Sequence, residues 1–215
     1  MSVIMQDDFT GTTIDTAKWN ITAPDNRFSQ NNAFIITNPH TTSLTAWANT
    51  LDSVSNVSSG VAVVQSNMDW GLQSNNPNLN GIGLWKNSSN WIMLFTGGAS
   101  NNEFRLIEYV GGSTLYDLNT GITNGNDVKI WTDGSTIKAY YWNGSAWVQM
   151  GITKTGSLGY NLQARIVLYN DNNAYNSANT ATFDNLYFSN EDYSTHYPAS
   201  SAPANTNFFQ MFFFK

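Results

Sequence analysis

The sequence contains no cysteine among its 215 residues, so neither disulfide bonds nor thiolate metal sites are available to the chain. Charged residues make up only 11%, well below the roughly one quarter usual in a soluble protein. The formal net charge is −6, which argues against a surface that follows a phosphate backbone. We therefore expect no nucleic acid partner, and neutral polyhydroxylated ligands are the better candidates.

Long apolar runs are also missing. No stretch approaches the roughly 20 apolar residues that a membrane-spanning helix needs. The N-terminal segment, residues 1–8, has neither the basic region nor the apolar region of a signal peptide. We therefore expect no membrane span, and synthesis in the cytoplasm without an export signal of the chain's own.

What the chain does have is alternation of apolar and polar residues, with 41% hydrophobic and 14% aromatic residues. Asp133-Gly134 and Asn143-Gly144 separate alternating runs, and these dipeptides are the strongest short signals for β-hairpins. No segment holds a helical apolar period for long. The fold class predicted is all-β, a two-sheet antiparallel sandwich.

The stretch 182–190 predicts the strand that closes this fold. Phe183, Leu186 and Phe188 are its apolar members, and the alternation slips at Asp184-Asn185. After this stretch the composition changes to Pro, Ser, Ala and Asn, which is typical of a linker. We therefore predict a β-sandwich over residues 1–190, and an extended tail with a docking peptide over residues 191–215.

Three groups of residues resemble the concanavalin A-like lectin/glucanase and laminin G-type jelly rolls. Residues 7–19, with Asp7-Asp8-Phe9 and a later Asp and Trp, look like the opening of those domains. Residues 128–147 resemble their late hairpins, and residues 183–187 resemble their closing strand. The resemblance implies a jelly roll whose closing strand pairs near the first. The superfamily includes lectins, carbohydrate-binding modules, glycoside hydrolases, lyases and virion adhesins, so the fold does not choose the function.

The sequence offers little for catalysis. β-Glucan hydrolases of this fold carry a Glu-x-Asp-x-x-Glu motif, because glycosidic bonds are cleaved between two carboxyl groups. Only Glu103, Glu108 and Glu191 are present, and Glu103 and Glu108 are spaced to point to opposite faces of one strand. We interpret Glu103 as a strand-end charge and Glu108 as an exposed strand residue. Neither His40 nor His196 has neighbours that suggest a triad. The sequence predicts no catalytic residue and no enzyme.

The resemblance also implies a calcium ion where the N-terminal segment meets the closing strand. It would place Asp8 and Asp184 there, with loop carbonyls such as that of Gly11 nearby, and calcium prefers such oxygen ligands. The alternative is that both Asp residues only accept hydrogen bonds from backbone N–H groups. A second oxygen-rich segment around Asp171 reads better as a polar loop.

Sugar recognition needs aromatic platforms beside hydrogen-bonding side chains. Alternation places Trp131, Lys138, Tyr140 and Trp142 on one face of a hairpin, opposite the apolar face. The long polar loop with Trp70 and Asn76 is the other candidate, since loops at sandwich ends often bind ligands. The alternative for each Trp is burial between the two sheets. We expect glycans as ligands of these residues.

The C-terminal segment is strongly apolar but too short to span a membrane. An uncovered cluster of this kind would aggregate, so we expect it to be buried. Docking to another subunit of a virion or surface assembly is favoured over packing on its own domain, and a homo-oligomer stays open. The predicted docking residues are Phe208, Phe209, Met211, Phe212, Phe213 and Phe214.

These features together predict a non-catalytic virion surface protein, either a phage capsid decoration or a tail adhesin, at the virion surface or cell exterior. Its lectin-like domain would bind glycans and its C-terminal peptide would dock to the particle. The first alternative is a carbohydrate-binding or laminin G-like adhesion domain of a bacterial surface protein. The second alternative is a divergent polysaccharide-degrading enzyme.

Overall fold

A computed structural model describes residues 3–24, 26–38, 49–56, 67–69, 79–96, 103–123, 127–156, 158–169 and 179–190. Within these ranges all regular structure is β, and no helix there could span a membrane. The predicted loop residues Trp70 and Asn76 and the whole tail 191–215 lie outside the described residues. The boundary at residue 190 therefore stays a prediction.

Most strands belong to two antiparallel sheets. The large sheet has the order β10 (Ser113–Thr123), β9 (Glu103–Val110), β8 (Asn90–Thr96), β7 (Leu79–Asn87), β14 (Gln163–Tyr169), β5 (Asn49–Ser53) and β2 (Trp19–Thr22). The small sheet has the order β11 (Val128–Thr132), β12 (Thr136–Trp142) and β13 (Trp147–Thr155).

The remaining strands form two further groups. One has the order β3 (Phe28–Gln30), β4 (Phe34–Asn38), β15 (Asn179–Asp184) and β6 (Asn67–Asp69). The other pairs β1 (Val3–Asp7) with β16 (Leu186–Ser189), so the closing strand does pair with the first.

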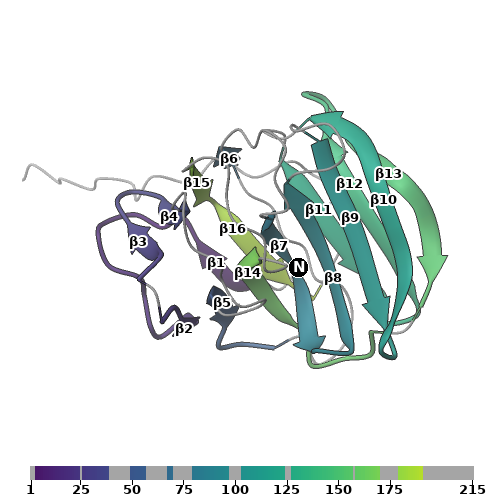
Figure 1. Cartoon of the computed structure of the whole chain (residues 1–215), viewed down its shortest axis with the longest axis horizontal. Coiled ribbons are helices and arrows are strands. Elements are labelled where there is room, and N and C mark those ends of the chain that lie inside the picture. Colours follow the sequence, from purple (N-terminus) through teal and green to yellow (C-terminus); the bar gives the residue numbers. More distant parts are fainter. Residues whose placement is uncertain are drawn as a thin grey trace, which may run out of the picture.

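One hydrophobic core joins these groups into a two-layer sandwich. Ile82 and Leu94 of the large sheet pack in the same core as Ile130 of β11, Phe34 of β4 and Phe188 of β16, and all five are fully buried. In Figure 1, β8, β9 and β10 are layered against β11, β12 and β13. The all-β sandwich predicted from alternation is confirmed.

The closing stretch is two strands rather than one. β15 ends at Asp184 and β16 begins at Leu186, and Asn185 between them has a left-handed φ of 57°. Asn tolerates this conformation better than most residues, which explains the slip in the alternation. The break lets the chain leave the β4–β15–β6 group and pair with β1.

The two small-sheet hairpins use the same turn chemistry. The Oδ1 atom of Asp133 accepts hydrogen bonds from the N–H and hydroxyl of Ser135 and from the N–H of Thr136. Asn143 makes the equivalent three bonds with the next turn. Gly134 and Gly144 follow with φ of 87° and 97°, which only glycine adopts readily. The hairpins predicted from Asp-Gly and Asn-Gly are confirmed.

Candidate functional site

The outer face of the large sheet, which points away from the sandwich core, carries an unusual set of side chains. Strand residues alternate between faces, and Leu84, Ile92 and Leu106 lie in the core. Their neighbours along the strands therefore face outward, and these form a second, smaller apolar cluster. The buried members of this cluster are Trp91, Met93, Phe95 and Val167, with Trp85, Ile107 and Tyr109 packed against them.

Three aromatic residues form a row across this face, called here the aromatic row: Trp85, Trp91 and Tyr109. Trp85 lies opposite Trp91 across β7 and β8, and Trp91 lies opposite Tyr109 across β8 and β9. The rings of Trp91 and Tyr109 are stacked, with centroids 5.3 Å apart and planes 16° apart. Trp85 and Tyr109 remain partly exposed. Trp91 between them is buried, so the row offers aromatic surface at its two ends, on β7 and β9.

An arginine lies against one end of the aromatic row. The guanidinium carbon of Arg165 lies 3.6 Å from the ring centroid of Trp85. Asp52 accepts two hydrogen bonds from the same guanidinium, at 2.5 and 2.8 Å. Only 8% of the Arg165 side chain and 15% of the Asp52 side chain are exposed. The ion pair therefore fixes the plane of the guanidinium against the indole.

Two glycines on β7 keep this face flat beside the row. A Cβ atom at Gly83 would lie 2.0 Å from the carbonyl oxygen of Ile92 and 2.6 Å from the sulfur of Met93. A Cβ atom at Gly81 would lie 2.5 Å from the ring of Phe95. Any side chain at either position would displace its neighbours, so glycine is required for this close approach.

The acidic residues on the outer face do not form a glycosidase pair. Asp52 lies on β5, and Asp117 lies on β10 and accepts two hydrogen bonds from Arg105. Five strand spacings separate β5 from β10, which at about 4.8 Å each amounts to roughly 24 Å. A glycosidase needs its two carboxyl groups about 5 to 10 Å apart. Glu103 also faces outward, on β9, but it lies four residues, about 13 Å, along the strand from the residue opposite Asp117. The described carboxylates of this face therefore supply no catalytic pair.

Glu103 and Glu108 point to opposite faces of β9, as predicted, but Glu108 is not the exposed residue we expected. Its side chain lies on the core face beside Leu106, and the residue is fully buried. Neither carboxylate oxygen has a hydrogen-bond partner. Burial raises the pKa of Glu108 to about 7, although the positive charge of Lys154 partly offsets this effect. Glu108 therefore cannot reach a ligand on the outer face.

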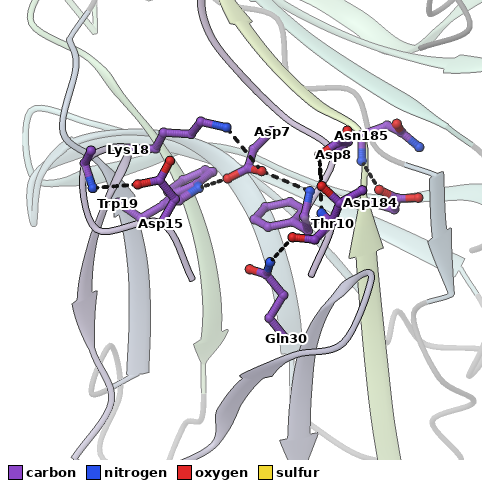
Figure 2. Close-up of polar contacts among 11 residues, drawn as sticks. Asp7, Asp8, Thr10, Asp15, Lys18, Trp19, Gln30, Asp184 and Asn185 are labelled. Atoms are coloured by element: carbon purple, nitrogen blue, oxygen red, sulfur yellow. Dashed lines mark hydrogen bonds and ion pairs between the residues drawn. The ribbon is translucent and has the colours of Figure 1, made fainter. Parts of the chain in front are cut away.

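The N-terminal motif has a structural role, as Figure 2 shows. The carboxylate of Asp7 accepts hydrogen bonds from the indole N–H of Trp19 at 2.6 Å and from the N–H of Phe9 at 2.9 Å. Lys18 lies 3.5 Å from the same carboxylate. Asp7 is buried, and the rings of Phe9 and Trp19 stack. These contacts anchor the first loop to the core.

Asp8 and Asp184 come together where β1 meets the junction of β15 and β16 (Figure 2). Burial raises the pKa of Asp184, and the charges of Asp8 and Asp7 raise it further, against a hydrogen bond from the N–H of Asn185. Each carboxylate also accepts a backbone N–H, Asp8 from Thr10 and Asp184 from Asn185, as the alternative expects. Calcium would relieve the repulsion of the two carboxylates, and each keeps a second oxygen that fits such an ion. The carbonyl of Gly11 already accepts a hydrogen bond from the N–H of Asn32. No larger group of acidic or histidine side chains suited to a metal occurs in the described ranges.

The other sequence-predicted site residues share one face, as expected. Trp131, Lys138, Tyr140 and Trp142 occupy outward positions of β11 and β12, while Ile130 and its inward neighbours are buried in the core. This face lies on the opposite side of the sandwich from the aromatic row. The structure therefore does not bring the two sets into one site.

Neither the aromatic row nor Arg165 was predicted from the sequence. The hairpin itself gave no signal, because a regular hairpin with Asn87 opposite Asn90 would place Trp85 and Trp91 on opposite faces. A register shift between Trp85 and Asn87 brings the two Trp residues opposite each other. Arg165 gave no local signal either. Its partner Asp52 lies far away in the sequence, and only the pairing of β14 with β5 brings the two together.

No family model matches the sequence, and no curated protein is similar to it in sequence. Solved structures do match the fold. A β-glucanase of Bacillus licheniformis is 14% identical with a TM-score of 0.62, and the match covers 86% of this chain and 97% of that one. The Crh5 transglycosylase is 13% identical with a TM-score of 0.63, covering 86% of this chain and 83% of the other. A xylan β-1,4-xylosidase of Bacillus halodurans is 13% identical with a TM-score of 0.61 over 85% of this chain, but that match spans only 38% of the xylosidase.

These similarities correct the main functional prediction. We predicted a non-catalytic virion surface protein and no enzyme, whereas the similar structures are a β-glucanase, a xylosidase and a transglycosylase. The findings favour the alternative of a polysaccharide-degrading enzyme. At this level of identity the similarity itself establishes the architecture: the chain has the concanavalin A-like jelly-roll fold that its opening and closing motifs resemble.

Proposed function

We propose that the protein acts on a polysaccharide, as a glycoside hydrolase or a transglycosylase, with the chain of sugars bound along the outer face of the large sheet. The observation that carries this proposal is the aromatic row with the Arg165–Asp52 pair at its end. Aromatic rings bind the C–H faces of sugars, and charged or amide groups bind the hydroxyl groups.

The aromatic row suits an extended ligand better than a single sugar. Its three members lie on adjacent strands, about 4.8 Å apart. Trp85 is held by Arg165, and Tyr109 is held by the buried Trp91, so little side-chain entropy is lost when a ligand contacts the exposed parts of Trp85 and Tyr109. A pre-ordered, linear platform of this kind supports binding of a polymer across the strands.

The proposal assigns no acid–base pair to the described outer-face carboxylates. Asp52 and Asp117 are both bound to arginines and lie far apart, and Glu103 lies four residues along β9 from the residue opposite Asp117. Other acidic residues of the sequence, among them Asp69, Asp171 and Glu191, are candidates by chemistry alone. Amide substitutions of these residues, one at a time, would identify the pair. Each essential carboxylate should reduce turnover by several orders of magnitude when replaced.

The direct test is the release of reducing ends from a panel of soluble polysaccharides that includes mixed-linkage β-glucan, xylan, laminarin and xyloglucan. Transfer without net hydrolysis would be detected with a fluorescent oligosaccharide acceptor. We expect turnover or transfer on at least one polymer, and none with heat-denatured protein. Binding without either reaction on the whole panel would refute the enzymatic proposal.

We also propose that Asp8 and Asp184 hold a calcium ion that ties β1 to the junction of β15 and β16. Support comes from the proximity of the two carboxylates in Figure 2 and from the effect of Asp8 on the pKa of Asp184. The ion would supply structural stabilisation rather than chemistry, since it would lie away from the aromatic row. Docking through Phe208–Phe214 and sugar binding by Trp70 and Asn76 stay predictions.

A further inference from the structure

The outer face of the small sheet carries a second set of aromatic and polar side chains, on the other side of the core from the aromatic row. Its members lie opposite one another on neighbouring strands. Lys129 pairs with Tyr140, Trp131 pairs with Lys138, and Trp142 pairs with Trp147. We call this set the lysine–aromatic patch: Lys129, Trp131, Lys138, Tyr140, Trp142 and Trp147.

Both lysines of the patch are placed against aromatic rings. The ammonium of Lys138 lies 4.7 Å from the ring centroid of Trp131. That of Lys129 lies 4.6 Å from the ring of Tyr140 and 5.2 Å from the ring of Trp147. Such contacts hold the ammonium groups in defined positions. Only Lys129 is buried, and the other five members are partly exposed.

The patch carries positive charge, although the protein as a whole is negatively charged. The chain as a whole carries −6, yet the strands β11, β12 and β13 contain no Asp or Glu. Asp127 precedes β11 at one corner, and Asp133 lies in the turn between β11 and β12. Asp127 lies opposite Trp142 and so on the same face, and the two lysines therefore leave this face with a net charge of +1 beside four aromatic rings.

We propose that the lysine–aromatic patch is a second carbohydrate-binding surface, specific for polysaccharides that carry carboxylate groups, such as polyuronates. The aromatic rings would stack on the sugar rings, while Lys138, which is partly exposed, pairs with a carboxylate at the surface and Lys129 adds attraction from beneath. The inference is independent of the proposed enzymatic function, since the two faces lie on opposite sides of the sandwich.

The test is a binding measurement on the full chain with polygalacturonate and alginate, compared with neutral laminarin and xyloglucan. We expect the polyuronates to bind this face and their affinity to fall as salt is raised. Trp142→Ala should weaken polyuronate binding about tenfold, and Lys138→Gln about three- to tenfold.

Two control variants separate this surface from other effects. Lys154→Gln removes one charge and one ammonium–ring contact of the same kind, 4.2 Å from Tyr116, on the core side of β13. Trp91→Ala alters the aromatic row. Both should leave polyuronate affinity unchanged, and thermal unfolding of each variant confirms that it is folded.

The proposal is overturned if polyuronates do not bind, if neutral polymers bind the patch equally well, or if Trp91→Ala weakens polyuronate binding as much as Trp142→Ala. It is also overturned if sedimentation shows a dimer that Trp142→Ala dissociates, because the face would then be an interface between copies of the chain. Loss of turnover on neutral polymers in Trp91→Ala alone would affect only the proposed enzymatic function.

Discussion

Glu108 is a carboxyl group in the apolar core. It lies on the core face of β9, fully buried, with Tyr116 opposite it on β10 and Ile92 opposite it on β8. The positive charge of Lys154 lowers the pKa of Glu108, but the Lys154 ammonium lies over the ring of Tyr116. The fold therefore favours the neutral acid, because an isolated buried carboxylate is costly.

The stability of the protein should fall as pH rises through this titration. The folded-state pKa of Glu108 is about 7 against 4.5 for the free group, so the stabilisation is complete below about pH 4.5 and is lost as pH rises through 7. At about 1.4 kcal/mol per pKa unit, the difference of about 2.5 units amounts to about 3 to 4 kcal/mol in total, of which about 2 to 3 kcal/mol is lost between pH 5 and pH 8. Urea unfolding at pH 5 and pH 8 measures it.

Glu108→Gln should remove most of this pH dependence and should be more stable than the wild type at pH 8. Glu103→Gln is the matched control, since it removes a carboxylate from the other face of the same strand. Equal pH dependence in the wild type and Glu108→Gln would show that the buried carboxyl group is not responsible.

Asp184 is a second carboxyl group whose environment affects stability. Burial and the neighbouring charge of Asp8 raise its pKa, so the ionised side chain destabilises the fold at neutral pH unless a cation is bound. Calcium should raise the melting temperature of the wild type, and Asp184→Asn should abolish that shift while melting no lower than the wild type in EDTA. Asp15→Asn, in a loop where Asp15 accepts the N–H of Ala17, is the control. An unchanged calcium shift in Asp184→Asn would exclude this site.

At the scale of the strand, the outer face of the large sheet contains two arginine–aspartate pairs with similar geometry and different surroundings. Arg165 and Asp52 are 8% and 15% exposed, and the guanidinium stacks on Trp85. Arg105 and Asp117 are 37% and 41% exposed. The first pair links β14 to β5 and supports the aromatic row, while the second is a surface pair between β9 and β10.

Replacing each arginine by lysine should separate these roles. Arg165→Lys keeps the charge but loses the two-pronged hydrogen bond and the stacking, so unfolding free energy should fall by about 1 to 3 kcal/mol. Arg105→Lys should cost about 0.5 kcal/mol or less, because exposed ion pairs contribute little. Denaturant unfolding gives both values, and similar losses in the two variants would contradict the supporting role of Arg165.

At the scale of the whole molecule, local patterns predicted more of the fold than of the site. Asp133-Gly134 and Asn143-Gly144 identified hairpins because the turn geometry requires those residues. The break at Asn185 was visible as a slip in alternation, but its consequence depended on pairing between β16 and β1, which no local pattern records. The buried position of Glu108 was not predicted, because alternation distinguishes the two faces of a strand but does not show which face lies in the core.

The site depended still more on distant pairings. The aromatic row needs β7, β8 and β9 side by side, and its support by Arg165 needs β14 next to both β5 and β7. Outward residues of the small sheet were predicted correctly because one hairpin contains them. The outer face of the large sheet combines segments from residue 20 to residue 169, and only the fold brings them together.

The central claim is that the protein acts on a polysaccharide bound to the outer face of the large sheet. The most direct measurement is the chain-length distribution of an end-labelled polysaccharide, for the polymer that gives the highest turnover, after incubation with the wild type, Trp91→Ala and Trp142→Ala. We expect the wild type and Trp142→Ala to change the distribution at similar rates, and Trp91→Ala to be at least about tenfold slower, the equivalent of about 1.4 kcal/mol of lost binding. No change with the wild type, or equal rates for Trp91→Ala and the wild type, would contradict the account.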